Sequence, residues 1–163
     1  MVNKQTYDRA LVRLEALCAR SEQCTYDLKQ KLYRWGVSSD DASQIIKDLE
    51  MRRYVDDCRF ACAYVRDKYR FSRWGRNKIT LGLRAKNIEE NVIDEALDVI
   101  NQDEFMAGMK ALLLMKLRGT TVPLGYDERM RLYRFMSQRG FESSLISFVL
   151  KQIESSCNED GNF

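Results

Sequence analysis

Residues 28–49, LKQKLYRWGVSSDDASQIIKDL, read as two short helices joined at a single glycine. Their apolar residues recur every three or four positions, which is the spacing of a helix with one buried face. Gly36 separates the two runs. Glycine is the residue that best adopts the left-handed backbone found just past a helix C-terminus. The stretch therefore predicts a helix, a tight turn at Gly36 and a second helix.

The same pattern returns twice along the chain. Asn87 stands at the turn position 51 residues after Gly36, and Gly140 stands there a further 53 residues on. Asparagine also tolerates a left-handed backbone. Apolar spacing is shared by all amphipathic helices, so the weight of the prediction rests on the turn residue. The apolar positions that correspond in the three copies are Leu28, Leu32, Val37, Ala42, Ile46 and Leu49; Ile79, Leu83, Ile88, Ile93, Leu97 and Ile100; and Leu132, Met136, Phe141, Ile146, Leu150 and Ile153.

A repeat of about 50 residues determines the predicted fold. The chain has 163 residues with one proline and eight glycines, a composition poor in helix breakers. We predict an all-α protein of three tandem three-helix repeats, over residues 1–55, 56–101 and 102–155, followed by a polar tail at 156–163. Such units bury too little surface alone and stack on their neighbours, so the predicted array is elongated and curved.

Several residues are predicted to begin or end these helices. Thr25 and Ser38 precede the second and third helices as candidate N-caps, and the pair Asp56 and Asp57 precedes the fourth. The last helix is predicted to end at Glu154, before a disordered tail.

Charge is unevenly distributed although the net charge is only +3. Residues 66–86 contain eight basic residues and one acid, a local charge of +7, whereas residues 87–109 contain seven acids and no base. A basic segment of this kind favours an anionic partner, either nucleic acid or an acidic protein surface. The alternative interpretation is that long basic side chains simply solvate a helical surface.

The candidate binding residues lie in this basic segment. Arg66, Arg70 and Arg73 share one helical face, provided that the helix continues through residue 70. A basic stripe is predicted to continue in the third repeat through Lys116, Arg118, Arg129, Arg131, Arg134 and Arg139. The residues predicted to contact this anionic partner are Arg66, Arg70, Arg73, Arg76 and Lys78.

Aromatic residues interleave with these bases. Tyr69, Phe71 and Trp74 could stack on nucleic-acid bases or on side chains of a partner protein. Alternatively, they cover the joint between two repeats and leave the arginines as its solvated rim.

Catalytic chemistry is not predicted. Histidine is absent, which removes the commonest general base and metal ligand. The five cysteines fit no zinc spacing, and Cys58 and Cys62 are predicted to be inert core thiols. We expect no catalytic residue, no metal site and no cofactor. The N-terminus does not resemble a signal peptide, and the longest apolar run, residues 111–115, is too short to span a bilayer, so a cytoplasmic protein is expected.

One motif resembles that of a known family. Residues 56–61, DDCRFA, resemble the D-D-x-R-F-A signature of the RecX family. The basic stretch 73–79, followed by Leu83, is similar to the family's next helix, and residues 20–36 are similar to its first repeat. The resemblance extends over roughly residues 10–155 and includes the three-repeat organisation. The chain departs from it at Asn87, where the family usually has glycine, and in the longer connection at 119–125.

The resemblance implies a bacterial cytoplasmic regulator of the RecA recombinase. Such a protein binds the RecA filament on DNA and inhibits its ATPase, strand-exchange and coprotease activities, thereby modulating recombination, DNA repair and the SOS response. The implied partner is the RecA filament, with nucleic acid met through the filament or weakly directly. No membrane is expected, and a monomer is the simpler expectation. The alternative is a helical-repeat module that binds single-stranded nucleic acid directly through a basic face.

Overall fold

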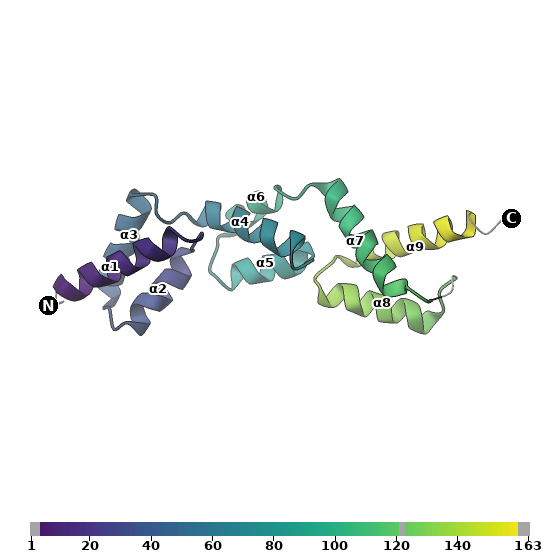
Figure 1. Cartoon of the computed structure of the whole chain (residues 1–163), viewed down its shortest axis with the longest axis horizontal. Helices are drawn as coiled ribbons and strands as arrows, with labels where there is room; N and C mark the ends of the chain where they lie inside the picture. Colours follow the sequence, from purple (N-terminus) through teal and green to yellow (C-terminus); the bar gives the residue numbers. More distant parts are fainter. Residues whose placement is uncertain (1–3, 121–122, 160–163) are drawn as a thin grey trace. The chain divides into compact units, whose positions relative to one another are not determined.

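The computed structural model describes residues 4–120 and 123–159, and within these ranges the chain forms helices and no strand (Figure 1). The prediction of an all-α protein is confirmed. The helices in chain order are α1 (Lys4–Cys18), α2 (Thr25–Arg34), α3 (Ser39–Met51), α4 (Asp57–Arg70), α5 (Arg76–Arg84), α6 (Glu90–Leu97), α7 (Gln102–Leu117), α8 (Tyr126–Gln138) and α9 (Ser143–Glu159).

Three corners of the chain share one hydrogen-bonding pattern. Gly36, Asn87 and Gly140 have φ angles of 76°, 53° and 85°, all in the left-handed region. In each corner this residue donates its N–H to the carbonyl three residues back, and the next residue donates to the carbonyl five back. The donor–acceptor pairs are Gly36–Tyr33 and Val37–Leu32, Asn87–Arg84 and Ile88–Leu83, and Gly140–Ser137 and Phe141–Met136, at 2.9–3.2 Å. The three predicted turn positions are therefore corresponding corners.

The helix N-termini follow the predicted caps with one exception. The Ser38 hydroxyl accepts the N–H of Asp41 at 3.2 Å, and Asp56 accepts that of Arg59 at 3.0 Å. Thr25, however, is not a cap but the first residue of α2. The Asp57 carboxylate accepts both its N–H, at 2.8 Å, and its hydroxyl, at 2.7 Å. An acid 32 residues away thus performs the capping that was predicted for Thr25.

Helix α9 is longer than predicted. It continues to Glu159, so residues 155–159 are helical and not part of a disordered tail. The remainder of the predicted tail, residues 160–163, lies outside the described residues, as do residues 121 and 122 of the connection at 119–125.

The chain packs as two compact units. The first comprises the described residues up to Tyr64 together with Leu83–Ala96, and the second comprises Val65–Gly82 together with the described residues from Leu97 onward. The boundaries of the units therefore fall within α4 and α5 and at the end of α6. The repeat boundaries and the curved array stay predictions.

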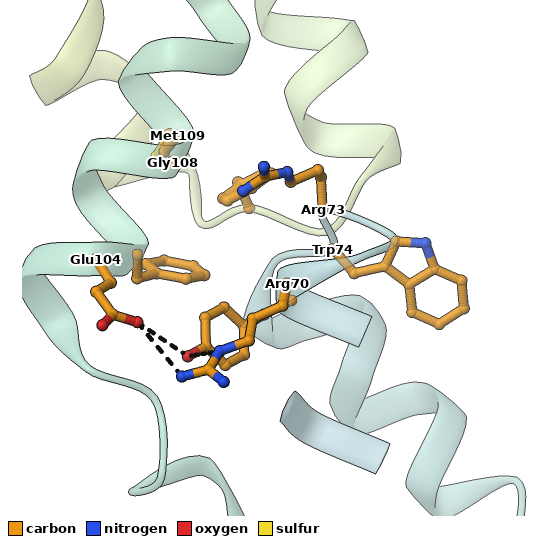
Figure 2. Close-up of a pocket in the computed structure, with 9 residues that line it drawn as sticks. Arg70, Arg73, Trp74, Glu104, Gly108 and Met109 are labelled. Carbon is orange, nitrogen blue, oxygen red and sulfur yellow. Dashed lines mark hydrogen bonds and ion pairs between the residues drawn. The ribbon is translucent and has the colours of Figure 1, made fainter. Parts of the chain in front are cut away.

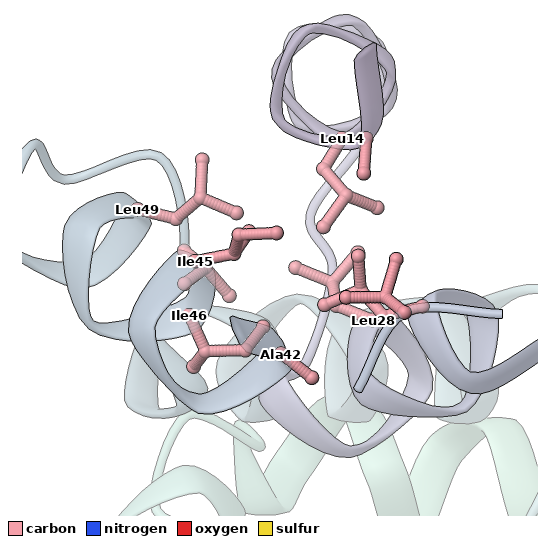
Figure 3. Close-up of a cluster of buried hydrophobic side chains, with 10 residues drawn as sticks. Leu14, Leu28, Ala42, Ile45, Ile46 and Leu49 are labelled. Atoms are coloured by element: carbon pink, nitrogen blue, oxygen red, sulfur yellow. The ribbon is translucent and has the colours of Figure 1, made fainter. Parts of the chain in front are cut away.

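The first unit is built around the apolar faces of α1, α2 and α3. Figure 3 shows Leu14 of α1 pointing towards Leu28 of α2 and towards the α3 side chains that include Ile45 and Leu49. Each of these four residues is fully buried. The remaining buried members of this cluster are Ala10, Leu32, Val37, Ala42, Ile46 and Val55. The periodic positions that define residues 28–49 thus form the core of this unit.

The second unit contains a close backbone contact between two glycines. Gly75 donates its N–H to the Arg139 carbonyl at 2.7 Å, and Asn77 donates to the Gly140 carbonyl at 3.0 Å. A Cβ placed on Gly75 would lie 2.3 Å from the Gly140 oxygen, so no side chain fits there. The amide groups at the start of α5 thereby satisfy carbonyls at the end of α8, an arrangement that the two helix dipoles also favour.

Candidate partner-binding surface

The basic segment of α4 and the loop after it lies in the second unit. Helix α4 continues through Arg70, so Arg66 and Arg70 lie one turn apart, as predicted. Arg73 lies beyond the helix end with a φ of 56°, so its predicted place on the same helical face is wrong. The Arg66 and Arg73 side chains are exposed and form no hydrogen bond or ion pair within the described ranges.

Arg70 is linked to α7. Its Nε donates to the Tyr69 hydroxyl at 2.9 Å, and a terminal nitrogen lies 3.7 Å from the Glu104 carboxylate. Arg70 and Glu104 lie beside each other in Figure 2, and together with Tyr69 they line a small hollow of about 100 Å³. The hydrogen bond to Tyr69, together with the nearby Glu104 carboxylate, raises the pKa of Arg70. Its cation is thus partly compensated before any partner arrives.

Arg76 is held more firmly inside the unit. Its guanidinium donates to Gln102 at 2.7 Å, lies 3.8 Å from the Glu142 carboxylate and stands 4.7 Å from the centroid of the Phe105 ring. These contacts join α5 to α7 and to the start of α9. They give Arg76 a structural role that the sequence did not reveal, because its partners lie 26 or more residues away.

Lys78 is also engaged, through Trp74. The ammonium groups of Lys68 and Lys78 lie 4.7 Å and 4.6 Å from the Trp74 ring centroid. Lys78 also donates to the Gln138 carbonyl at 3.4 Å. Trp74 is half-buried and its ring is in contact with both ammonium groups, so it is not a free platform for stacking, and whether it covers a joint between repeats stays a prediction.

The two other aromatic residues of this segment, Tyr69 and Phe71, differ in how far they are exposed. Tyr69 is buried, with 7% of its surface exposed, whereas Phe71 is 81% exposed. Phe71 is therefore the aromatic residue of this segment that is available to a partner.

Further basic residues of the predicted stripe are paired within the second unit. Arg129 forms an ion pair with Glu154 at 2.7 Å, and Arg139 donates to the Ser72 carbonyl at 3.1 Å. In the first unit, Arg84 binds Glu90 at 2.6 Å and holds the pKa of that carboxyl below its usual value. Most of the bases of residues 66–86 are thus bound by neighbouring side chains, and Arg66 and Arg73 are the arginines of this segment that have no partner among the described residues.

The remaining candidate chemistry is sparse. In the described part of the chain, no three or more cysteine or acidic side chains are grouped so as to hold a metal ion. Cys58 is exposed, so its predicted place in the core is wrong, while Cys62 is half-buried. Cys24 is fully buried, and burial raises its pKa to about 11. Among the same described residues, no helix has both the length and the apolar character needed to cross a bilayer.

Comparisons with known proteins agree with this architecture. The family model described as "RecX, second three-helix domain" matches residues 56–97, and "RecX, third three-helix domain" matches residues 111–150. The "Regulatory protein RecX" of Pelodictyon phaeoclathratiforme is 30% identical over 125 residues, covering 77% of this chain and 76% of the relative. That of Clostridium tetani is 26% identical over 138 residues, covering 82% of this chain and 61% of the relative.

Two solved structures share the fold. The crystal structure of RecX from Lactobacillus salivarius has a TM-score of 0.81 at 17% identity, covering 92% of this chain and 97% of the other. A second structure, of "regulatory protein RecX", has a TM-score of 0.78 at 23% identity, covering 88% and 72%.

The fold defines a modular all-α protein whose corners and three-helix segments recur along the chain. The chain belongs to the RecX family, whose curated members described above are named as regulatory proteins. It spans 51–61% of the length of three of the curated relatives that it matches.

Proposed function

We propose that this protein regulates a RecA recombinase by binding its filament on DNA and inhibiting the ATPase, strand-exchange and coprotease activities of that filament. In this proposal the protein is not an enzyme; it acts in the cytoplasm and modulates recombination and DNA repair. Its membership of the RecX family is the observation that carries this proposal. The exposed guanidinium groups of Arg66 and Arg73, which have no ionic partner in the described part of the chain, support it because they offer charge to an anionic surface.

The proposed mechanism depends on the positive charge of this surface and on how binding shifts the equilibrium between filament states. The cationic flank, formed by the exposed Arg66 and Arg73, contacts an acidic surface of the recombinase or DNA phosphate. Both contacts weaken as salt screens them. A bound regulator shifts a filament from its active state only if it binds another state more tightly. Inhibition of the ATPase therefore requires a difference in affinity between the active filament and the state that the regulator favours.

A titration of the full chain into a RecA filament on single-stranded DNA tests the proposal. With ATP present, the hydrolysis rate is expected to fall with increasing protein and to recover as salt is raised. A hydrolysis rate that stays constant while the regulator is in molar excess at low salt would contradict the proposed function.

Direct binding of single-stranded nucleic acid is the second candidate function. The exposed ring of Phe71, between Arg70 and Arg73, favours it because bases stack on aromatic rings beside cations. Fluorescence anisotropy of a labelled oligothymidylate, with and without recombinase and ATP, separates the two functions. Tight binding to the bare oligonucleotide that recombinase leaves unchanged favours the second function.

A further inference from the structure

A groove beside α7 combines exposed apolar surface with positive charge. It measures about 460 Å³, and its lining comes from the loop after α4, from α7 and from the end of α8. Its lining includes Phe71, Arg73, Gly108, Ala111, Met115 and Arg139. All of them belong to the second unit.

The apolar part of the groove is open to solvent. Phe71 is 81% exposed and Met115 is 51% exposed, although both are large and apolar. Gly108 and Ala111 present little bulk between them on α7. An exposed apolar surface of this kind favours contact with an apolar side chain of a partner.

The charged part of the groove has one sign. Arg73 and Arg139 line it, and none of its described lining residues is acidic. A Cβ placed on Gly108 would lie 3.5 Å from a terminal nitrogen of Arg73, so this guanidinium extends over α7, as Figure 2 shows. Arg139 already donates to the Ser72 carbonyl, which fixes its position at the groove. An arginine pair of this kind suits a carboxylate.

The backbone of Arg73 adds an independent observation. Its φ of 56° is unfavourable for a residue with a side chain, yet the guanidinium makes no hydrogen bond or ion pair within the described chain. Strained residues of this kind concentrate at binding sites. Among the described residues, Arg73 has no hydrogen-bonding or ionic partner that would explain an arginine where glycine would be less strained.

We propose that this groove binds an acidic segment of a partner protein that carries an apolar side chain. The apolar side chain lies on Ala111 and Met115 against Phe71, while a neighbouring carboxylate pairs with Arg73 and Arg139. The inference rests on the proposed function only for the identity of the protein that supplies this segment.

Two other occupants fit less well. Single-stranded nucleic acid needs a succession of cations along its backbone, whereas this groove has two arginines and an apolar floor. A second copy of this chain would offer its acidic stretch, residues 87–109. That stretch exposes no large apolar side chain that could serve as the anchor.

Fluorescence anisotropy of the full chain with a labelled short peptide tests the inference. The peptide carries a Leu-Phe pair flanked on both sides by Asp and Glu, and a matched peptide carries Ser-Ser in place of that pair. We expect saturable binding of the first peptide and binding at least about tenfold weaker for the second, because the anchor loses its apolar area.

Two alanines of α7 provide matched variants. Ala111 lines the groove, whereas Ala107, one turn earlier and also exposed, does not. Ala111→Glu is expected to weaken peptide binding about tenfold or more, whereas Ala107→Glu changes it by less than about twofold. Arg73→Gly is expected to weaken binding while raising the melting temperature, which separates loss of the contact from loss of the fold.

Several outcomes overturn the inference. These are absence of saturable binding, equal effects of Ala111→Glu and Ala107→Glu, and equal affinity for the two peptides. If Ala111→Glu weakens the binding of an oligothymidylate more than it weakens the binding of the peptide, the groove is assigned to nucleic acid. Self-association in sedimentation equilibrium that Ala111→Glu abolishes would assign it to a second copy. No recombinase is present in these experiments, so their failure leaves the ATPase test of the proposed function unaffected.

Discussion

Arg53 and Arg73 take the left-handed backbone that glycine and asparagine take at the three corners. Their φ angles are 58° and 56°, and each follows the end of a helix by two or three residues. For a residue with a Cβ, this conformation costs about 1–2 kcal/mol. Arg73 belongs to the proposed surface, whereas Arg53 lies in the first unit, so the pair allows strain and function to be separated.

Arg53→Gly and Arg73→Gly are each expected to raise the free energy of unfolding by about 0.5–1 kcal/mol. The relief of strain outweighs the extra chain entropy that glycine loses on folding. Urea denaturation of the two variants and the wild type provides the measurement. A decrease for both variants would show that the left-handed conformation is not strained in this protein.

The buried thiol of Cys24 predicts a dependence of stability on pH. Burial raises its pKa from 9.0 to about 11 in the folded chain. Between these values the unfolded thiol loses its proton while the folded thiol keeps it, so the free energy of unfolding falls as pH rises. The stabilisation is complete below pH 9 and is lost towards pH 11.

Cys24→Ala isolates this contribution. Relative to the variant, the wild type is expected to lose up to about 1.4 kcal/mol of unfolding free energy per pH unit within that window. Urea titrations at several pH values measure both proteins. Stability curves that stay parallel from pH 9 to pH 11 would contradict the expectation.

At the scale of elements, the contact between Gly75 and Gly140 fixes the start of α5 against the end of α8. Gly75→Ala places a methyl group 2.3 Å from a carbonyl oxygen. The overpacking is expected to cost about 1–3 kcal/mol or more, because backbone atoms cannot move aside as a flexible side chain can.

Gly108→Ala is the matched control for this substitution. Gly108 lies inside α7, and the nearest atom to its added Cβ would be an arginine nitrogen at 3.5 Å, an ordinary contact. This variant is expected to gain about 0.5–1 kcal/mol, since alanine is the better helix former. Thermal and urea unfolding compare the two variants, and similar values for both would contradict the described backbone contact.

Asp57 connects two elements of the first unit. Asp57→Ala removes two hydrogen bonds to Thr25 and is expected to cost about 2 kcal/mol. Asp56→Ala removes only a local cap bond and is expected to cost about 1 kcal/mol. Chemical denaturation measures both variants. A larger loss for Asp56→Ala would argue against the bond across 32 residues.

The elements that sequence could predict are those whose causes are local. The corners at Gly36, Asn87 and Gly140 follow from residue type and apolar spacing, and the structure confirms all three. The capping of Thr25 by Asp57 and the binding of Arg76 to Gln102 and Glu142 were missed, because each partner is 26 or more residues away in the chain. The α7 groove was missed for the same reason.

At the scale of the whole molecule, the basic and acidic segments partly neutralise each other within each compact unit. Arg84 binds Glu90 in the first unit, and Arg70 approaches Glu104 in the second. The charge that remains for a partner is therefore smaller than the sequence count of residues 66–86. We therefore expect Arg66 and Arg73 to make most of the proposed contact with the partner.

Recombinase ATPase inhibition by charge-reversed variants tests the central claim most directly. Arg20 and Arg34 serve as the matched control, because they are exposed arginines in the first unit with no ion pair within the described ranges. The double variant Arg66→Glu/Arg73→Glu is expected to require at least about tenfold more protein for half-inhibition, whereas Arg20→Glu/Arg34→Glu inhibits like the wild type. Circular dichroism confirms that both are folded. Equal inhibition by the two folded double variants would contradict the assignment of this flank as the recombinase-binding surface.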